Sequence, residues 1–220
     1  PQSIIDLFPL GVLNAHGGDL PRYRGNACQA WAIINGEDKI GLCIHKMIGG
    51  ELDSGDIISR DYLNIDHNTK ITKVWEWMKA RTPILMSEAI SNLESNPSYF
   101  LEQQSKDPKD TLRCYPRKPE DGRIDWSQNP LSILRLINAS NKPYSGAFCI
   151  FEDEKLIVWD AEIIEDKEIF SAVHGQVLKI DDGFIEVACS NGKLRLLKLE
   201  YKGKVVQPSD IIRSIRKRLL

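Results

Sequence analysis

Two polar side chains follow a short apolar run near the start of the chain. In the stretch GVLNAHGGDLPRYRG, residues 11–25, Asn14 and His16 come directly after the apolar residues and lead into a glycine-rich loop. Ligands of open α/β sheets bind at the carboxyl ends of strands, where such loops begin. Residues two apart on an extended segment project to the same side, so we expect an amide and an imidazole to face one pocket. An isolated N-x-H pattern is more often a loop whose histidine has only a structural hydrogen bond.

A second polar loop, ELDSGD at residues 51–56, supplies carboxylates after another apolar run. If the two strands are neighbours, Asp53 joins Asn14 and His16; the alternative for this loop is an Asx-type turn. A carboxylate raises the pKa of an adjacent imidazole, and an amide N–H with an imidazole can stabilise an oxyanion. This set suits attack by an amine on an acyl carbon. Because no serine or cysteine nucleophile accompanies it, direct transfer is favoured over a covalent intermediate.

The elements around these loops are typical of an α/β domain. Apolar runs predict strands at 39–47 and 57–65, and helical spacing predicts a helix over 27–36 that ends at a glycine. A longer helical pattern covers 69–94, where Pro83 is expected to kink or divide the helix. Strands alternating with helices predict a parallel or mixed sheet.

The second half of the chain has a different composition. Prolines and charges gather at 103–122, which we interpret as a linker wrapping over the first domain. A helix is expected over 130–140, and five short alternating strands over 146–201 predict a small β-barrel. Ser209 can cap a basic helix that runs to the end of the chain. We therefore predict a catalytic domain at 1–102, a linker at 103–122 and a second domain at 123–220.

Composition excludes several classes of protein. With 220 residues, a net charge of −2, 42 % hydrophobic and 27 % charged residues, the chain has the balance of a soluble globular protein. No apolar run approaches the roughly 18 residues of a transmembrane helix, so we expect neither a signal peptide nor a membrane partner. Five cysteines without a CxxC pair indicate a reducing, cytoplasmic setting and buried packing roles rather than disulfides or zinc ligands.

The motifs together resemble one known family. NAHGGDLPRYRG resembles the N-x-H-x-S-L-L-P-x-x-R-G signature of the formyltransferases that use 10-formyltetrahydrofolate, and GLCIHKM…ELDSGDII resembles their second motif. The segments at 120–148 and 174–200 resemble the family's linker and carboxy-terminal barrel. The resemblance implies an α/β Rossmann-like formyltransferase domain followed by a small OB-like β-barrel domain. It also implies an opening half of the Rossmann-like domain that this sequence lacks, so we expect a fuller chain.

The resemblance also implies roles for individual residues. Asn14, His16 and Asp53 match the catalytic positions: Asn14 and His16 would stabilise the tetrahedral oxyanion, and Asp53 would tune His16 and help to relay the amine proton. The formyl donor would be 10-formyltetrahydrofolate, with no metal. Positions matching segments that line the folate site are Leu20, Pro21, Arg22, Tyr23, Gly49, Gly50, Glu51 and Leu52. One departure is Gly18-Asp19, where the motif usually has Ser and Leu.

Two acceptor classes dominate this family, nucleotide-linked amino sugars and initiator methionyl-tRNA. The segments GLCIHKM, GGELD, RCYPRKPEDG and NKPYSGAF look more like the sugar formyltransferases, so a small nucleotide-linked amino sugar is the favoured acceptor. Residues 175–220 carry ten basic and five acidic side chains, a balance that could hold the phosphates of a tRNA or be a solvated surface.

Two further classes of function are alternatives. A catalytically inactive binding module with this family's fold is one, because of the missing half-domain. A metal-dependent hydrolase using His16, His45, His67 and Asp53 is the other, but no HExxH spacing is present and His45 falls inside a predicted strand. A lone strand histidine is more often structural. The oligomeric state is open.

Overall fold

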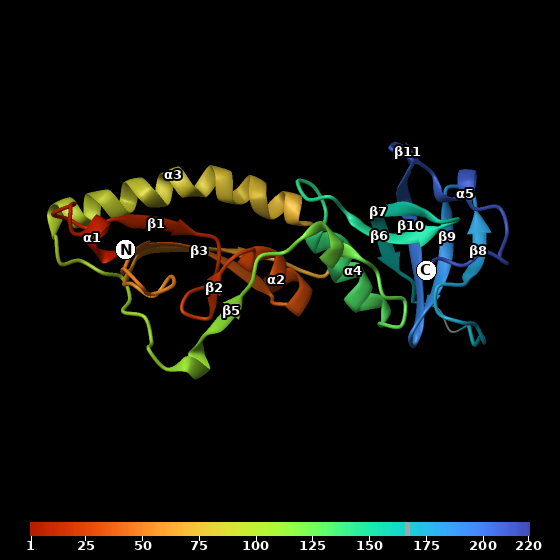
Figure 1. Cartoon of the computed structure of the whole chain (residues 1–220), viewed down its shortest axis with the longest axis horizontal. Helices are drawn as coiled ribbons and strands as arrows, with labels where there is room; N and C mark the ends of the chain where they lie inside the picture. The colour runs from red at the N-terminus through yellow and green to blue at the C-terminus, as the bar shows by residue number, and fades with distance from the viewer. Residues whose placement is uncertain (166–167) are drawn as a thin grey trace. The chain divides into compact units, whose positions relative to one another are not determined.

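The computed structural model describes residues 1–165 and 168–220, which form two compact units (Figure 1). The first unit holds Pro1–Asp66 and Thr72–Arg117, and the second holds His67–Ile71 and Lys118–Leu220. The division at Arg117 and Lys118 falls within the predicted linker at 103–122.

The site depends on an antiparallel sheet in the first unit. Strands β1 (Leu13–His16), β3 (Lys39–Lys46) and β4 (Ile57–Asn64) lie in the order β1-β3-β4, and both pairings are antiparallel. The predicted parallel or mixed character is therefore wrong for this sheet. A short loop without a helix joins β3 to β4, whereas parallel neighbours need a crossover connection of about a dozen residues or more.

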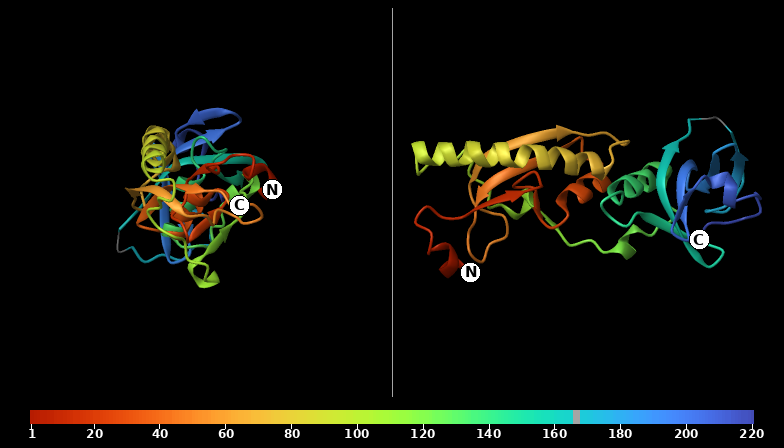
Figure 2. Two further views of the ribbon diagram at one scale, coloured as in Figure 1. Left: turned by 90° about the vertical axis from the view of Figure 1, so that its left-hand side faces the viewer. Right: turned by 90° about the horizontal axis from the view of Figure 1, so that it is seen from above.

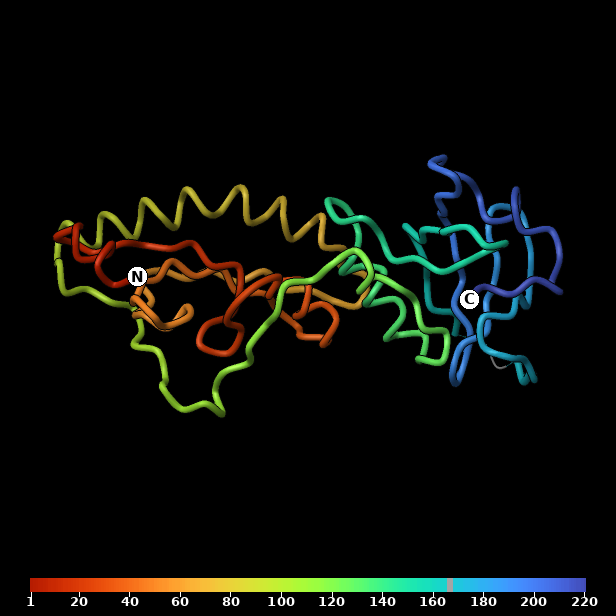
Figure 3. The backbone as a smooth tube through the Cα atoms, in the orientation of Figure 1, coloured from red at the N-terminus to blue at the C-terminus, as the bar shows by residue number. Residues whose placement is uncertain are grey.

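A separate parallel ladder joins two short strands that the sequence patterns did not predict. β2 (Tyr23–Gly25) pairs with β5 (Leu112–Cys114), in register from Tyr23 opposite Leu112 to Gly25 opposite Cys114. Figure 3 shows the segment before β5 running out from the unit and returning beside β2. Part of the predicted linker is therefore built into the first unit.

Three helices complete the first unit, and two of them were predicted. α1 (Gln2–Ile5) is a single turn, and α2 (Cys28–Asn35) ends at Gly36 in the left-handed conformation, as expected for a glycine stop. α3 (Ile71–Ser95) runs unbroken through Pro83, so the predicted division does not occur. The helix lies along the sheet of β1 and β3 (Figures 1 and 2), and its apolar side chains pack on that sheet in a cluster formed by Leu42, Ile44, Ile58, Leu85 and Ala89.

The second unit confirms the predicted β-barrel. Its elements are α4 (Pro130–Ala139), β6 (Ala147–Phe151), β7 (Glu154–Ile163), β8 (Val177–Asp181), β9 (Phe184–Cys189), β10 (Gly192–Tyr201), β11 (Lys204–Val206) and α5 (Pro208–Ile211). The strands form an antiparallel sheet in the order β6-β7-β10-β9-β8, with β11 paired to β10. Helix α4 is capped by Asn129, whose side-chain oxygen accepts from the Ser132 N–H at 2.9 Å. Two 3-10 turns, Pro108–Asp110 and Pro119–Gly122, lie earlier in the chain.

The carboxy-terminal segment closes this barrel, where a basic helix was predicted. Leu220 and Ile150 of β6 exchange backbone hydrogen bonds of 2.6 and 2.9 Å, and the Leu219 N–H donates to the Gly175 carbonyl at 2.8 Å beside β8. The segment therefore bridges the two edge strands and pairs backbone groups that an open sheet would expose. Burial of Leu219, 1 % exposed, favours this arrangement over a helix.

The predicted cap of that helix also has another role. Ser209 lies inside the short helix α5, whose N-cap position is Gln207. The Ser209 hydroxyl instead accepts from the Gly183 N–H at 3.2 Å, between β8 and β9.

Two further findings concern the whole of the described chain. Among the residues that the structure describes, no helix has the length and apolar character needed to cross a membrane. All five cysteines are buried free thiols, as the sequence analysis predicted for packing residues.

The closing segment generates a stability prediction. We expect Leu219→Ala to lower the free energy of unfolding of the barrel by roughly 2–5 kcal/mol, the usual cost of emptying a core leucine site. The matched control is Leu220→Ala, because the neighbouring side chain is 62 % exposed and its truncation should change stability by less than about 0.5 kcal/mol. Urea unfolding followed by tryptophan fluorescence measures both. Equal effects of the two variants would contradict a core role for the segment.

Candidate active site

The pairing of β1 with β3 determines where two of the predicted catalytic residues point. Asn14 lies opposite His45 and His16 lies opposite Cys43. Both predicted residues belong to β1 itself instead of the loop after it. Because side chains alternate along a strand, Asn14 and His16 share one face, and directly opposite residues share it too. His45 therefore joins them on that face.

Asp53 reaches the same place from the loop between β3 and β4. Its Oδ2 atom lies 3.6 Å from His16 Nδ1, and its Oδ1 atom lies 3.6 Å from His45 Nε2. The Gly25 N–H donates to Oδ2 at 2.9 Å. Asp53 has a φ of 46°, in the left-handed region that short polar side chains tolerate better than most. The three predicted catalytic side chains thus lie in one cluster, with Asp53 between two imidazole rings.

A backbone acceptor orients the His16 ring. Its Nε2 atom lies 2.7 Å from the Tyr23 carbonyl oxygen, so Nε2 carries a proton and Nδ1 faces Asp53. Gly18 makes room for this contact. A Cβ atom at Gly18 would come within 2.5 Å of His16 Nε2 and 2.7 Å of the Tyr23 carbonyl oxygen. Close packing therefore explains the glycine at this position of the loop.

The surroundings of His16 and Asp53 determine their protonation states. Burial lowers the pKa of His16 below its ordinary value of 6.5, and the attraction of Asp53 offsets this only in part. For Asp53, burial acts to raise the pKa, but the polar groups that face the carboxylate, among them the Gly25 N–H, outweigh it and hold the pKa below 3.8. At neutral pH a neutral imidazole with a free Nδ1 lone pair therefore faces an ionised carboxylate. Such a pair can take up a proton and stabilise the resulting imidazolium.

Sequence reasoning missed a residue that holds the Asp53 loop. Gln104 is 4 % exposed, and its side-chain N–H groups donate to the carbonyl oxygens of Asp53 at 2.9 Å and Gly55 at 2.6 Å. Its Oε1 atom accepts from Arg24 Nη2 at 2.9 Å. Nothing in the proline-rich context of Gln104 signals this role, because it arises from contacts with residues about 50 and 80 positions away in the chain.

The sequence analysis weighed His45 as a metal ligand or, more often for a strand histidine, a structural residue, and the structure shows its partners. The ring is 1 % exposed and lies in β3, as the strand prediction implied. Its Nε2 atom is 3.2 Å from Asn14 Nδ2. Within the described part of the chain, no group of three or more His, Cys, Asp and Glu side chains is placed to hold a metal ion.

The predicted folate-lining residues occupy varied positions in the first unit. Leu20 is 1 % exposed and belongs to a small core cluster. Arg22 and the Tyr23 hydroxyl both donate to Glu37, at 3.0 and 2.6 Å, and the Gly49 N–H donates to Gln2 Oε1 at 2.8 Å. Asp19, the departure from the motif, accepts from the Tyr62 hydroxyl at 3.0 Å.

Two of these residues, Glu51 and Leu52, line a cavity of about 320 Å³. Arg24, Ser54, Thr111 and Arg113 complete its lining. The register of β2 with β5 places Arg24 opposite Arg113, so the cavity has a cationic wall next to the Asp53 loop. The folate assignments as a set stay predictions.

Three solved structures share this fold. HypX from Aquifex aeolicus, solved with tetrahydrofolic acid, matches 92 % of this chain with a TM-score of 0.66 and 19 % identity, and this chain covers 35 % of HypX. WlaRD, described as a sugar 3N-formyl transferase and solved with dTDP and 5-N-formyl-THF, matches 88 % of this chain at a TM-score of 0.62 and 18 % identity, with 66 % of WlaRD covered. Methionyl-tRNA formyltransferase from Clostridium thermocellum matches 76 % at a TM-score of 0.56 and 23 % identity, with 69 % covered.

Family models match both units. The model described as "Formyl transferase" matches residues 1–90, and "Formyl transferase, C-terminal domain" matches residues 117–216. The first match contains Asn14, His16 and Asp53, and the second contains the barrel. The chain belongs to the formyltransferase family.

Proposed function

We propose that this protein moves a formyl group from 10-formyltetrahydrofolate to a primary amine. The observation that carries the proposal is the cluster of Asn14, His16 and Asp53, in which the Asp53 carboxylate lies 3.6 Å from the His16 ring. An amide donor, a neutral imidazole and an ionised carboxylate are the groups that amine attack on a formyl carbon requires.

Each residue has a defined part in the proposed reaction. The amine attacks the formyl carbon, and an N–H of Asn14 stabilises the negative oxygen of the tetrahedral intermediate, which His16 also stabilises once it has taken up a proton. The nitrogen must lose a proton, which His16 Nδ1 can accept while Asp53 stabilises the imidazolium. Return of that proton to the departing nitrogen of tetrahydrofolate completes the transfer. This direct route needs neither a covalent enzyme intermediate nor a metal.

The proposed donor site lies along the loop at 49–52 and the segment at 20–23. The cavity lined by Glu51 and Leu52 supports this placement, because it lies next to the residue that contacts His16. Relatives of the same fold have been solved with tetrahydrofolate and a formyl-tetrahydrofolate, which also supports a folate donor.

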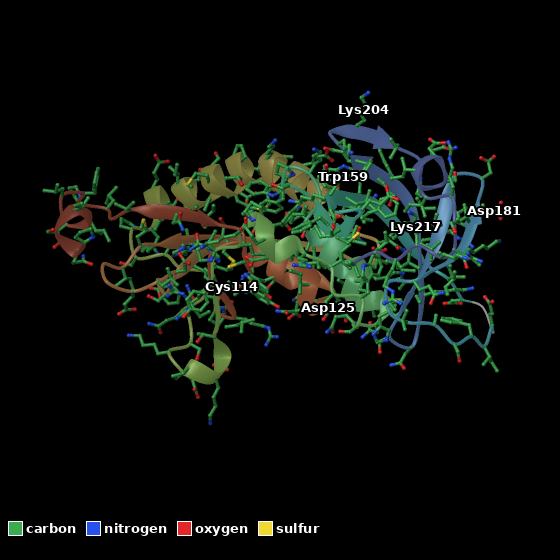
Figure 4. The ribbon with its side chains drawn as sticks, turned by 45° about the vertical axis from the view of Figure 1, so that its right-hand side comes forward. Cys114, Asp125, Trp159, Asp181, Lys204 and Lys217 are labelled. Atoms are coloured by element: carbon green, nitrogen blue, oxygen red, sulfur yellow. The ribbon has the colours of Figure 1, made fainter. Side chains whose placement is uncertain are left out.

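The proposed acceptor is the amine of a nucleotide-linked amino sugar. A relative solved with dTDP supports this class, and another relative that acts on methionyl-tRNA makes initiator tRNA the alternative. Many basic side chains of the barrel already have carboxylate partners, which weakens the case for a phosphate-binding face: the pairs are Lys179–Asp181, Lys193–Glu186, Arg195–Glu162 and Lys217–Glu152. Figure 4 shows Lys204 projecting away from the barrel.

The first test is a transfer assay on the full chain. We expect formylation of an amino sugar linked to a nucleotide when 10-formyltetrahydrofolate is supplied, and a loss of about 10²-fold to 10⁴-fold in rate for His16→Ala, the usual contribution of a general acid–base group. His174→Ala is the control, because His174 is an exposed histidine of the second unit. Mass spectrometry of the acceptor measures both variants.

The same assay separates the alternatives. Formylation of charged initiator tRNA without formylation of any amino sugar would replace the proposed acceptor. Folate binding by calorimetry without turnover on either acceptor would favour the inactive binding module. Unchanged turnover by His16→Ala would remove His16 from the mechanism.

The charge pair generates a prediction about pH. Because the imidazole must be neutral to accept the amine proton, kcat/KM should fall as the pH drops through the pKa of His16, which lies below 6.5. Asp53→Asn removes the attraction that raises this pKa, so the pKa of His16 should fall further, the acid limb should move to lower pH, and the maximal rate should decrease.

An NMR titration of the His16 ring provides the measurement, with the pH–rate profile beside it. Asp56→Asn is the matched control, since it removes a carboxylate from the same loop that has no assigned role. A His16 pKa that is equal in Asp53→Asn and in the unaltered protein would contradict the coupling.

A further inference from the structure

His45 lies next to Asn14 on the face of the sheet that carries the candidate active site. It is the cross-strand partner of Asn14 in the β1–β3 pairing, and its ring is 1 % exposed. The proposed reaction assigns it no role. A buried imidazole next to a group that stabilises charge needs an explanation, because burying a polar ring is unfavourable unless both nitrogens have partners.

The partners of His45 define its tautomer. Its Nδ1 atom lies 2.9 Å from the Lys46 carbonyl oxygen, which can only accept, so Nδ1 carries the proton. In the neutral ring Nε2 then has a free lone pair. Asn14 Nδ2 lies 3.2 Å from Nε2 and can only donate. The two contacts are satisfied together by a neutral ring that accepts from the Asn14 amide.

We propose that His45 is a positioning residue that holds the Asn14 amide with its NH₂ group toward the reacting centre; the inference rests on the proposed formyl transfer. The NH₂ group has two hydrogens. His45 Nε2 accepts one of them, which leaves the other for the oxyanion. Without this acceptor the Asn14 amide can flip by a half-turn about its last side-chain bond and present Oδ1 to the developing negative charge. An oxygen at that point repels the intermediate that the N–H stabilises.

The geometry argues against a proton-relay role for the same ring. His45 Nε2 lies 3.6 Å from Asp53 Oδ1, beyond hydrogen-bond distance, and a neutral ring protonated on Nδ1 has no hydrogen to give there. Asp53 therefore remains the partner of His16, while His45 acts through Asn14. The two histidines have different tasks although their ring centroids are only 6.1 Å apart.

Two substitutions distinguish positioning from packing. His45→Leu fills the buried space but removes the acceptor, so we expect kcat for formyl transfer to fall about tenfold or more. The loss should be smaller than the roughly 10²-fold to 10³-fold loss on deleting an oxyanion donor, and KM for the folate donor should be unchanged. His45→Gln keeps an acceptor oxygen near the place of Nε2 and should recover most of kcat. His174→Leu, at an exposed histidine, is the control for the loss of an imidazole.

A double-mutant cycle tests whether His45 acts through Asn14. Asn14→Ala removes the positioned donor, so adding His45→Leu should slow the reaction no further. Full additivity of the two losses would overturn the proposal, as would a His45→Leu enzyme as fast as the unaltered one. A His45→Gln enzyme no faster than His45→Leu would also overturn it, provided that thermal unfolding shows all variants folded.

A spectroscopic test does not depend on activity. The side-chain amide of Asn14, observed by ¹⁵N NMR in the full chain, should shift in His45→Leu and return toward its original position in His45→Gln. If no acceptor is formylated by the unaltered protein, the proposed function fails, and this amide signal still decides whether His45 holds Asn14. An Asn14 resonance that is identical in all three proteins would refute the contact.

Discussion

The register of β1 on β3 is the constraint on which the site depends. Asn14 lies opposite His45 and His16 lies opposite Cys43. A shift of one residue would turn Asn14 and His16 to the other face of the sheet, because side chains alternate along a strand. Leu13 of the same strand packs against the apolar cluster beneath α3 and opposes such a shift, since the shift would turn Leu13 away from that cluster. The hydrophobic packing of the sheet therefore also sets the position of the polar cluster.

Burial of this polar cluster is compatible with stability because nearly every group has a partner. His16 and His45 each face a backbone carbonyl, and Asp53 accepts the Gly25 N–H. An unsatisfied buried polar group costs about 1–3 kcal/mol, so a half-formed network would be a substantial burden on a fold of ordinary stability. Gln104 extends the network to the backbone of the Asp53 loop. Removal of water from around these groups also strengthens their electrostatic effect on any bound substrate.

Much of the fold was predictable from local patterns. The helix that ends at Gly36, the strands of β3 and β4 and the strands of the barrel follow from apolar spacing and turn residues, and the three candidate catalytic residues follow from the motifs. The features that escaped prediction depend on distant contacts. The pairing of β2 with β5 and the extended carboxy-terminal segment are stabilised by partners far away in the chain, which periodicity does not report. For the same reason the sequence identified His45 only as a strand residue, whereas its contact with Asn14 follows from the register of the two strands.

Because the five cysteines are buried, their reaction with a thiol reagent can report transient opening of the fold. Cys28, Cys43 and Cys114 lie in the first unit, whereas Cys149 and Cys189 lie in the barrel. Burial raises the pKa of both barrel thiols to about 12, which leaves almost no thiolate for alkylation while the barrel is closed. A thiol reagent added to the folded chain would therefore modify Cys149 and Cys189 only when the barrel transiently opens, and peptide mapping of these two cysteines would follow that opening.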